Sequence, residues 1–187
     1  MIVIVPPSPA WSSEFQRIGA KLRTALDDAA LRIDHIGSTA VANLDAKDII
    51  DVQVTVASFA NLTAPFERAG FKLLDGYTRD HQPPGMSLPA IELEKRLFKP
   101  DSSRPANVHV RIEGRFNQRY PLLCRDYLRA HPKAASAYAE IKRQLARRFP
   151  NDTEAYYDVK DPVFDLIMAG AEEWAQATNW QLGASDG

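Results

Sequence analysis

A short turn, together with a carboxylate that follows it, constrains the fold of this chain more than any other feature. Residues 35–39 read His-Ile-Gly-Ser-Thr and end one apolar segment, and twelve residues lie between Ser38 and Asp51 in the next segment. A Gly-Ser turn lets backbone N–H groups approach a phosphate closely, and a nearby carboxylate can hold the Mg²⁺ that neutralises the phosphate. The sequence therefore predicts a phosphate-binding turn at Gly37, Ser38 and Thr39, with Asp51 as metal ligand and catalytic carboxylate.

Alternating apolar and polar residues predict strands at about 31–36, 49–56, 91–98 and 107–113. If the last three strands are neighbours, their polar faces merge into one surface, which carries Asp51, Gln53, Glu92, Glu94, Arg96, His109 and Arg111. We interpret this surface, beside the Gly-Ser turn, as the candidate site. A sheet with one face in solvent alternates in the same way.

Gln53 decides what such a site can do. Phosphoryl or nucleotidyl transfer usually uses paired carboxylates, so that two metal ions bridge the attacking and leaving oxygens, and an amide is a weak ligand by comparison. We therefore expect one Mg²⁺ at Asp51, with Gln53 and Glu94 (or Glu92) as further ligands and phosphates of the bound molecule completing the shell. Alternatively, Gln53 only solvates a strand face, and the site binds a nucleotide without turning it over.

The two strand histidines are expected to differ. His109 lies on the polar face and is predicted to be a general base or a phosphate ligand, or else a surface histidine. His35 falls on the apolar side of its strand, which favours a hydrogen-bonded core histidine. Arg96, also on the polar face, is predicted to bind phosphate.

Composition excludes several classes of protein. Hydrophobic residues make up 45% and charged residues 25% of the chain, as in ordinary globular domains. The formal net charge of −1 gives no overall attraction to nucleic acid or anionic lipid, and no apolar run is long enough to span a bilayer. The lone Cys124 excludes an internal disulfide and fits a reducing compartment, so we expect a cytoplasmic protein.

The pattern predicts one α+β domain over residues 1–176. A mixed sheet with flanking helices is expected in about 1–115 and a helical part in about 116–176, followed by a flexible tail at 177–187. The loop 76–90 is rich in Gly, Pro and charge and is interpreted as a lid over a site.

Helical spacing defines the remaining elements. The first helix should begin at Ser8-Pro9 and bury Trp11, Phe15, Ile18, Leu22 and Leu26. Helices are also expected from Asn117 to His131, then to Pro150, and from Asp152 to about Ala175, the last one kinked or broken at Pro162.

Basic residues concentrate in the helical part. The cluster at 142–148 is interpreted as a solvated helix face. Arg125 and Lys160 are candidates for clamping a phosphate from these helices, and Lys47 can reach one from the loop before Asp51. The neighbouring Asp48 can instead hold Lys47 in a surface ion pair.

Short stretches spread over about residues 3–168 resemble one family, the GrpB-like proteins. They are Val5-Pro6, Pro9-Ala10-Trp11, residues 35–41, Lys47, residues 49–52, residues 107–110, residues 125–132, Tyr156 and Lys160. Two departures lie in the loop before Asp51, where Ala42-Asn43 replaces Pro-Gly and Asp48 replaces proline.

The resemblance implies a nucleotidyltransferase-like fold and a tie to dephospho-CoA kinase, to which similar domains are fused. In that fold two acids separated by one apolar residue usually follow the Gly-Ser turn, and Gln53 takes the place of the second. The expected function is Mg²⁺–NTP binding with transfer of a nucleotidyl or phosphoryl group to a small acceptor. The alternative is a non-catalytic module that binds a nucleotide or a CoA-like molecule, and a third possibility is a pure interaction protein.

Overall fold

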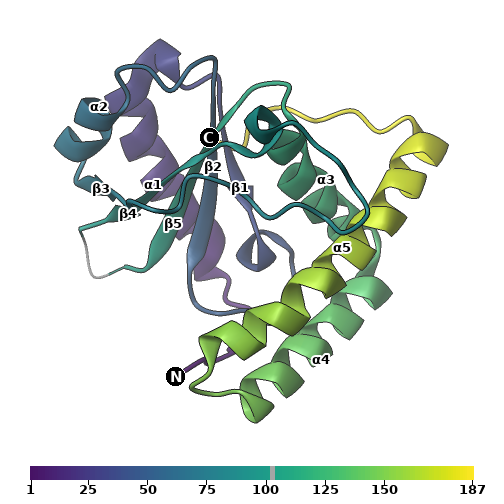
Figure 1. Cartoon of the computed structure of the whole chain (residues 1–187). Helices are drawn as coiled ribbons and strands as arrows, with labels where there is room; N and C mark the ends of the chain where they lie inside the picture. Colours follow the sequence, from purple (N-terminus) through teal and green to yellow (C-terminus); the bar gives the residue numbers. More distant parts are fainter. Residues whose placement is uncertain (102–103) are drawn as a thin grey trace.

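The computed structural model of the chain describes residues 1–101 and 104–187 (Figure 1). Within these residues, five strands form one mixed sheet in the order β1-β2-β5-β4-β3. The strands are β1 Arg32–Ile36, β2 Ile50–Val56, β3 Phe71–Leu73, β4 Arg96–Pro100 and β5 Ala106–Ile112. The central pair β2 and β5 is parallel, and each of the other neighbouring pairs is antiparallel. This arrangement confirms the predicted α+β fold.

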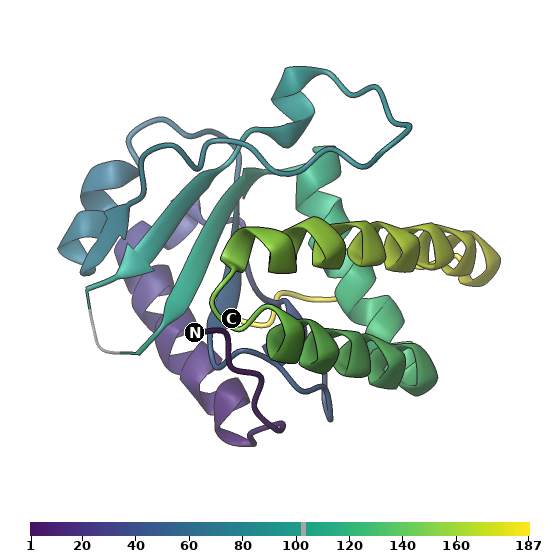
Figure 2. The ribbon, with the colours of Figure 1, turned by 60° about the horizontal axis from the view of Figure 1, so that its bottom comes forward.

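Helices cover both faces of this sheet. Two lie on one side, α1 Ala10–Leu26 and α2 Thr63–Arg68, and three on the other, α3 Phe116–Ala130, α4 Pro132–Arg148 and α5 Thr153–Thr178. Figure 2 shows the last three as a separate layer beside the sheet. None of the described helices combines the length and the apolar character needed to cross a lipid bilayer.

The main core lies between α1, α2 and the sheet. Phe15 and Leu22 of α1, both almost fully buried, pack with the apolar face of β2 and β5, as the helical spacing of the sequence predicts. Each such side chain contributes about 1.5–3 kcal/mol through burial. This layer fixes which way β2 faces, so Asp51 points to the opposite side.

One strand starts later than predicted. Residues Ala90–Leu93 form a 3-10 turn, and β4 begins only at Arg96. Leu97 pairs with His109 and Arg96 with Val110, and paired residues of antiparallel strands point to the same face. Arg96 therefore shares the face of Val110, and its predicted position beside His109 is wrong.

The helical part follows the prediction, with two differences. Helix α5 continues through Pro162 for 26 residues and is not broken there. Residues 185–187, within the predicted tail, lie along the edge of β1, where the backbone N–H of Gly187 donates to Ile33 O at 3.0 Å. The Ser185 hydroxyl also donates to Ile33 O, at 2.8 Å.

Candidate functional site

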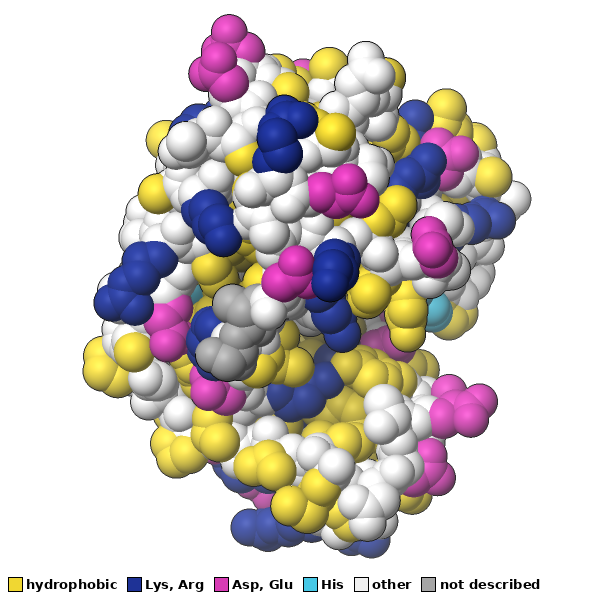
Figure 3. All heavy atoms as spheres, turned by 90° about the vertical axis from the view of Figure 1, so that its left-hand side faces the viewer, with side chains coloured by type: hydrophobic (Ala, Val, Ile, Leu, Met, Phe, Trp, Pro, Cys, Tyr) yellow, Lys and Arg dark blue, Asp and Glu magenta, His cyan; other side chains and the backbone are white. Residues whose placement is uncertain are grey.

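A cleft of about 700 Å³ lies between the sheet and the helices α3, α4 and α5. Its walls come from the turn after β1, the strands β2, β4 and β5, the loop before β4 and the three helices. In Figure 3 the surface is hollowed between its upper and lower parts, and basic and hydrophobic side chains line the hollow. We call this space the central cleft.

The Gly-Ser turn forms one wall of the central cleft, as predicted. Gly37 has a φ of +71°, and Ser38–Ala40 form a short 3-10 turn. A Cβ atom at position 37 would stand 2.6 Å from Asp51 Oδ2, so a larger residue does not fit without movement. Glycine is required here for both its conformation and its size.

Asp51 lies on the floor of the cleft with two partners from β5. Asn107 Nδ2 donates to Asp51 Oδ1 at 2.8 Å, and His109 Nε2 lies 3.8 Å from the same oxygen. Burial opposes ionisation of Asp51, but His109, Asn107 and the charge of Lys47 together hold the pKa of this carboxyl below its ordinary value. Asp51 is therefore an anion at neutral pH.

His109 is held in its neutral form. Burial lowers the pKa of His109, and the charges of Arg111 and Lys95 lower it further, while Asp51 acts in the opposite direction. Its Nδ1 atom is buried and has no hydrogen-bond partner among the residues that the structure describes. A neutral imidazole beside a carboxylate is the arrangement that a general base requires.

Gln53, predicted as a metal ligand, lies outside the cleft. Helix α3 covers it: Gln53 Nε2 donates to Gln118 O at 2.8 Å, and Arg111 Nη1 donates to Gln53 Oε1 at 2.7 Å. Both polar ends of the amide are thus bonded to the protein. Gln53 is therefore not available as a metal ligand, and the prediction of this role is wrong. The alternative, a residue in contact with solvent, is wrong as well, because Gln53 is buried.

Glu92 and Glu94, the residues predicted as a second metal ligand, also lie outside the cleft. Glu94 pairs with Arg115 at 3.1 Å, and Glu92 accepts from the backbone N–H of Phe116 at 2.7 Å; neither borders the cleft. Residues 1–101 and 104–187 contain no group of three His, Cys, Asp or Glu side chains arranged to hold a metal ion. Neither of the glutamates predicted as a second ligand therefore joins Asp51 at the cleft.

The loop before β4 is fastened to the sheet by Asp80. Arg111 contacts both carboxylate oxygens of Asp80, at 2.8 and 2.9 Å, and Lys95 Nζ and Asn117 Nδ2 donate to them at 2.7 and 3.0 Å. Although burial opposes it, the charges of Arg111 and Lys95 hold the pKa of Asp80 far below its ordinary value. The loop thus forms a fixed rim of the cleft.

Lysines gather at the end of the cleft near α4 and α5. Lys142 Nζ donates to Ser38 Oγ at 2.8 Å and to Asp45 O at 2.6 Å. Lys47 Nζ contacts the Tyr157 hydroxyl and lies 4.6 Å from the centre of that ring, and Lys160 Nζ lies 5.3 Å from the same ring. The structure brings the predicted Ser38, Lys47 and Lys160 together.

Sequence reasoning missed Lys142. Its side chain is 2% exposed, so the predicted solvated face of α4 is wrong at this position. The signal for it was weak: Lys142 falls four residues after Tyr138 in the helix, on the same face as this buried aromatic residue.

Three other predicted residues are engaged within the protein. Arg125 is buried and pairs with Asp126 and Asp186, both at 2.7 Å. Arg96 stacks on Phe59 at 4.6 Å. The buried Thr39 hydroxyl lies 3.0 Å from His35 Nε2.

His35 is the core histidine that the strand pattern predicts. Its ring stacks on Phe15 with the ring centres 4.7 Å apart. Burial lowers the pKa of His35 to about 4, so the ring is neutral at pH 7 and supports the turn from behind.

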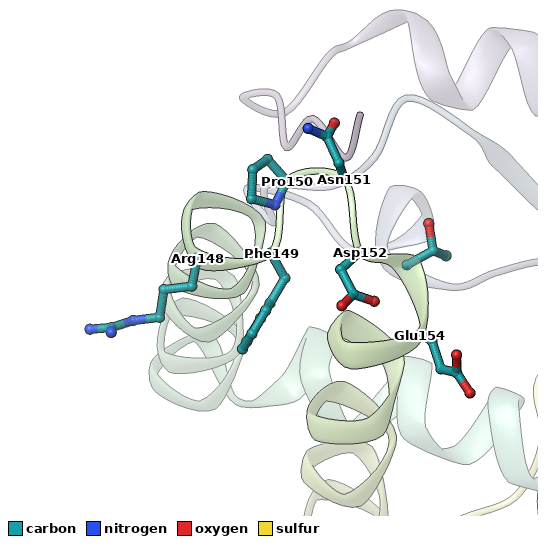
Figure 4. Close-up of a pocket in the computed structure, with 7 residues that line it drawn as sticks. Arg148, Phe149, Pro150, Asn151, Asp152 and Glu154 are labelled. Carbon is teal, nitrogen blue, oxygen red and sulfur yellow. The ribbon is translucent and has the colours of Figure 1, made fainter.

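A second hollow, of about 750 Å³, lies at the turn between α4 and α5 (Figure 4). Its lining, residues 148–154, comes from one continuous stretch of chain. Asp152 there accepts from Ala155 N at 3.0 Å and caps α5. The helix turn explains this hollow, and we assign it no function.

Comparison with known proteins places the chain in one family. The family model described as GrpB protein matches residues 1–170. A solved structure, the conserved protein GrpB from Enterococcus faecalis, is 29% identical, has a TM-score of 0.74, and is matched over 92% of this chain and 99% of its own. A cytoplasmic RNA terminal U-transferase is 14% identical, with a TM-score of 0.51 over 80% of this chain and 43% of its own; this likeness shows that the fold is nucleotidyltransferase-like.

Two curated proteins also resemble this chain over most of its length. A dephospho-CoA kinase of Mycolicibacterium paratuberculosis is 37% identical over 95% of this chain and 48% of the kinase, so the chain spans about half the length of this relative. A UPF0157 protein of Pseudomonas aeruginosa is 38% identical over 91% of this chain and 67% of that protein. On its sequence and its structure, the chain belongs to the GrpB family.

Proposed function

We propose that the central cleft binds a phosphate-bearing small molecule, either a nucleotide or a CoA-like phosphoadenosine. The observation that carries the proposal is a cleft of about 700 Å³ in which the Gly37-Ser38 turn faces lysines from three different elements. The volume lies within the range of pockets for small-molecule ligands. Backbone and lysine donors together suit phosphate oxygens.

The geometry best supports a protein that binds its ligand without catalysing a reaction. Transfer through two metal ions needs two carboxylates. Besides Asp51, the carboxylates that border the described part of the cleft are Asp80, Asp161 and Asp165, and each of them is bonded to other side chains of the protein. Asp51 is therefore not accompanied by a second free carboxylate in the described part of the cleft, and the described residues do not fit a pair of metal ions. We expect a substantial part of the affinity to persist without the metal.

The ligand class has support from the relatives. The part of the dephospho-CoA kinases that resembles this chain is about half of each protein, so a CoA-like molecule belongs among the ligands to be tested. The kinase activity of those proteins is not proposed for this chain.

A second candidate is transfer of a nucleotidyl or phosphoryl group to a small acceptor. The observation in its favour is the neutral His109 beside the ionised Asp51, since such an imidazole can remove a proton from an acceptor hydroxyl. If this candidate is correct, the protein releases pyrophosphate or a nucleoside diphosphate from an NTP when a suitable acceptor is present, and His109→Gln stops the release.

A thermal-shift titration tests the proposal. ATP, GTP, CTP, UTP and CoA are each added with and without Mg²⁺ to the wild type and to Asp51→Asn. A ligand at a hundredfold its dissociation constant adds about 2.7 kcal/mol of stability, which for a chain of this size raises Tm by about 5–10 °C. A shift with one of these ligands that persists without Mg²⁺ supports the binding module.

The other outcomes separate the two candidates. A shift that needs Mg²⁺ and disappears in Asp51→Asn favours the second candidate, transfer to an acceptor. If none of the five ligands shifts Tm under either condition, the cleft is not a site for nucleotides or CoA.

A further inference from the structure

Two ammonium groups at one end of the cleft lack an anionic partner. Lys142 donates to a hydroxyl and a carbonyl oxygen, and Lys47 contacts a tyrosine hydroxyl; neither forms an ion pair with a carboxylate among the residues that the structure describes. Buried charges in proteins are normally paired. Asp51 and Asp45 act on these lysines without forming an ion pair with them, so two ammonium groups that face one cleft with no carboxylate of the described residues in direct contact point to an anionic ligand.

Lys160 and the rings of Tyr156 and Tyr157 complete the end of the cleft near α4 and α5. Lys160 pairs with Asp161 at 3.0 Å, so this pair adds no net charge. The ammonium groups of Lys47 and Lys160 lie 4.6 and 5.3 Å from the centre of the Tyr157 ring, within the range of cation–π interactions. The Tyr156 hydroxyl beside them is buried and has no hydrogen-bond partner among the described residues. The result is a small cavity end with two lysine side chains that form no direct ion pair within the described part of the chain and with spare hydrogen-bonding capacity.

We propose that this end of the cleft is a subsite for a doubly charged phosphoryl group, and that Lys142 takes up a proton when this group binds. The inference rests on the proposed function and names the part of the ligand that is recognised. A group with two negative charges matches the two unpaired lysines, whereas a carboxylate or a single phosphodiester charge leaves one of them uncompensated.

Proton uptake follows from the surroundings of Lys142. The charged groups that act on it are Lys160 from α5, Asp45 and Lys47 from the loop before β2, and Arg143 from its own helix. The titratable Tyr138, also of α4, lies with its ring centre 4.6 Å from Lys142 Nζ. Burial lowers the pKa of Lys142 to about 7, and the charge of Lys160 acts in the same direction. Lys142 is thus partly neutral near neutral pH, and a bound dianion favours its charged form.

Calorimetric titration with inorganic pyrophosphate tests the subsite. Lys142→Met removes the ammonium group, and Lys133→Met, an exposed lysine of the same helix, is the matched control. Lys142→Met is expected to weaken pyrophosphate binding by about tenfold or more, while Lys133→Met leaves it within about twofold of the wild type. Thermal melting of each variant without ligand verifies that it is folded.

Lys142→Arg separates charge from proton uptake, because arginine stays protonated throughout the pH range. The proton count comes from binding enthalpies at pH 8 in buffers of different ionisation heat. We expect Lys142→Arg to bind pyrophosphate but to take up about one proton less than the wild type does. Equal proton uptake in the two proteins, or wild-type affinity in Lys142→Met, overturns the inference, as does a wild type that does not bind pyrophosphate.

The result is distinguishable from a failure of the proposed function. If pyrophosphate binds through Lys142 while no nucleotide and no CoA shifts Tm, the subsite stands and the proposed ligand class is wrong. If a nucleotide binds equally well to Lys142→Met and to the wild type, the ligand class stands and the subsite is wrong.

Discussion

The carboxylate of Asp51 lies against the backbone of Gly37, so closely that a Cβ atom at position 37 would stand 2.6 Å from Asp51 Oδ2. Gly37→Ala is therefore expected to displace the turn or the carboxylate. Together with the strain of a φ of +71°, this should lower the free energy of unfolding by about 1–3 kcal/mol and abolish nucleotide binding. Denaturant unfolding and ligand titration measure the two effects.

Gly114→Ala provides the control for the steric contact. Gly114 has a similar φ of +78°, but nothing lies within 4 Å of the Cβ position. We expect Gly114→Ala to lower stability through backbone strain alone and to leave ligand binding unchanged. Loss of binding in both variants would contradict the assignment.

Asp80→Asn should loosen the rim of the cleft. The change leaves Arg111 and Lys95 without the carboxylate that they share, and an uncompensated buried charge costs about 3 kcal/mol. Denaturant midpoints of Asp80→Asn and of Asp75→Asn, an exposed acid of the same loop, should differ accordingly. Equal midpoints would show that Asp80 does not fasten the loop.

His35 should make the protein sensitive to acid. Its pKa is lowered by burial to about 4 in the folded protein and is about 6.5 in an unfolded chain, so between these values the unfolded chain binds more protons. The free energy of unfolding is therefore expected to fall by roughly 3 kcal/mol as the pH is lowered from 6.5 to 4. His35→Phe, which retains the stack on Phe15, should remove this part of the pH profile; an unchanged profile would contradict the account.

Lys142 should make the free energy of unfolding depend on pH in the alkaline range. A lysine whose pKa is lowered by burial to about 7 is neutral in the folded protein and charged in the unfolded chain up to about pH 10. The stability of the ligand-free protein is therefore expected to rise with pH over this interval, by several kcal/mol. Chemical unfolding at pH 7 and pH 9 should show this rise in the wild type and in Lys133→Met, and show it reduced in Lys142→Met.

The sequence correctly predicts those features that are determined by residues close together in the chain. The turn at Gly37, the strands that flank it and the helix with Phe15 all follow from local conformational preference or from the periodicity of apolar residues. The family resemblance extends these local matches over the chain, and the fold confirms it.

The errors on β4 concern where the strand starts and which of its faces lies toward the cleft. The apparent alternation through Glu92, Glu94 and Arg96 ignores the 3-10 turn at Ala90–Leu93. In addition, Leu97 pairs with His109, so Leu97 and not Arg96 shares the face of His109. Lys95 and Leu97 line the cleft in place of Glu94 and Arg96. The turn at Ala90–Leu93 is not visible in the alternation of apolar and polar residues.

The positions of Gln53 and Lys142 depend on contacts between distant segments. Helix α3 covers Gln53 through Gln118, and Lys142 is buried because α4 packs against the loop that contains Asp45. Which helix covers which part of a sheet is not encoded in the pattern of any one segment. The burial of polar residues at such contacts therefore cannot be predicted from the sequence pattern.

The central claim, that the cleft binds a phosphate-bearing nucleotide or CoA-like molecule, is tested most directly by calorimetric titration of the wild type with ATP, CoA and adenosine in the absence of Mg²⁺. The account predicts saturable binding of ATP or CoA at one site and no measurable binding of adenosine, because the lysines contact phosphate. Absence of binding by both ATP and CoA, or equal binding of adenosine and ATP, would contradict it.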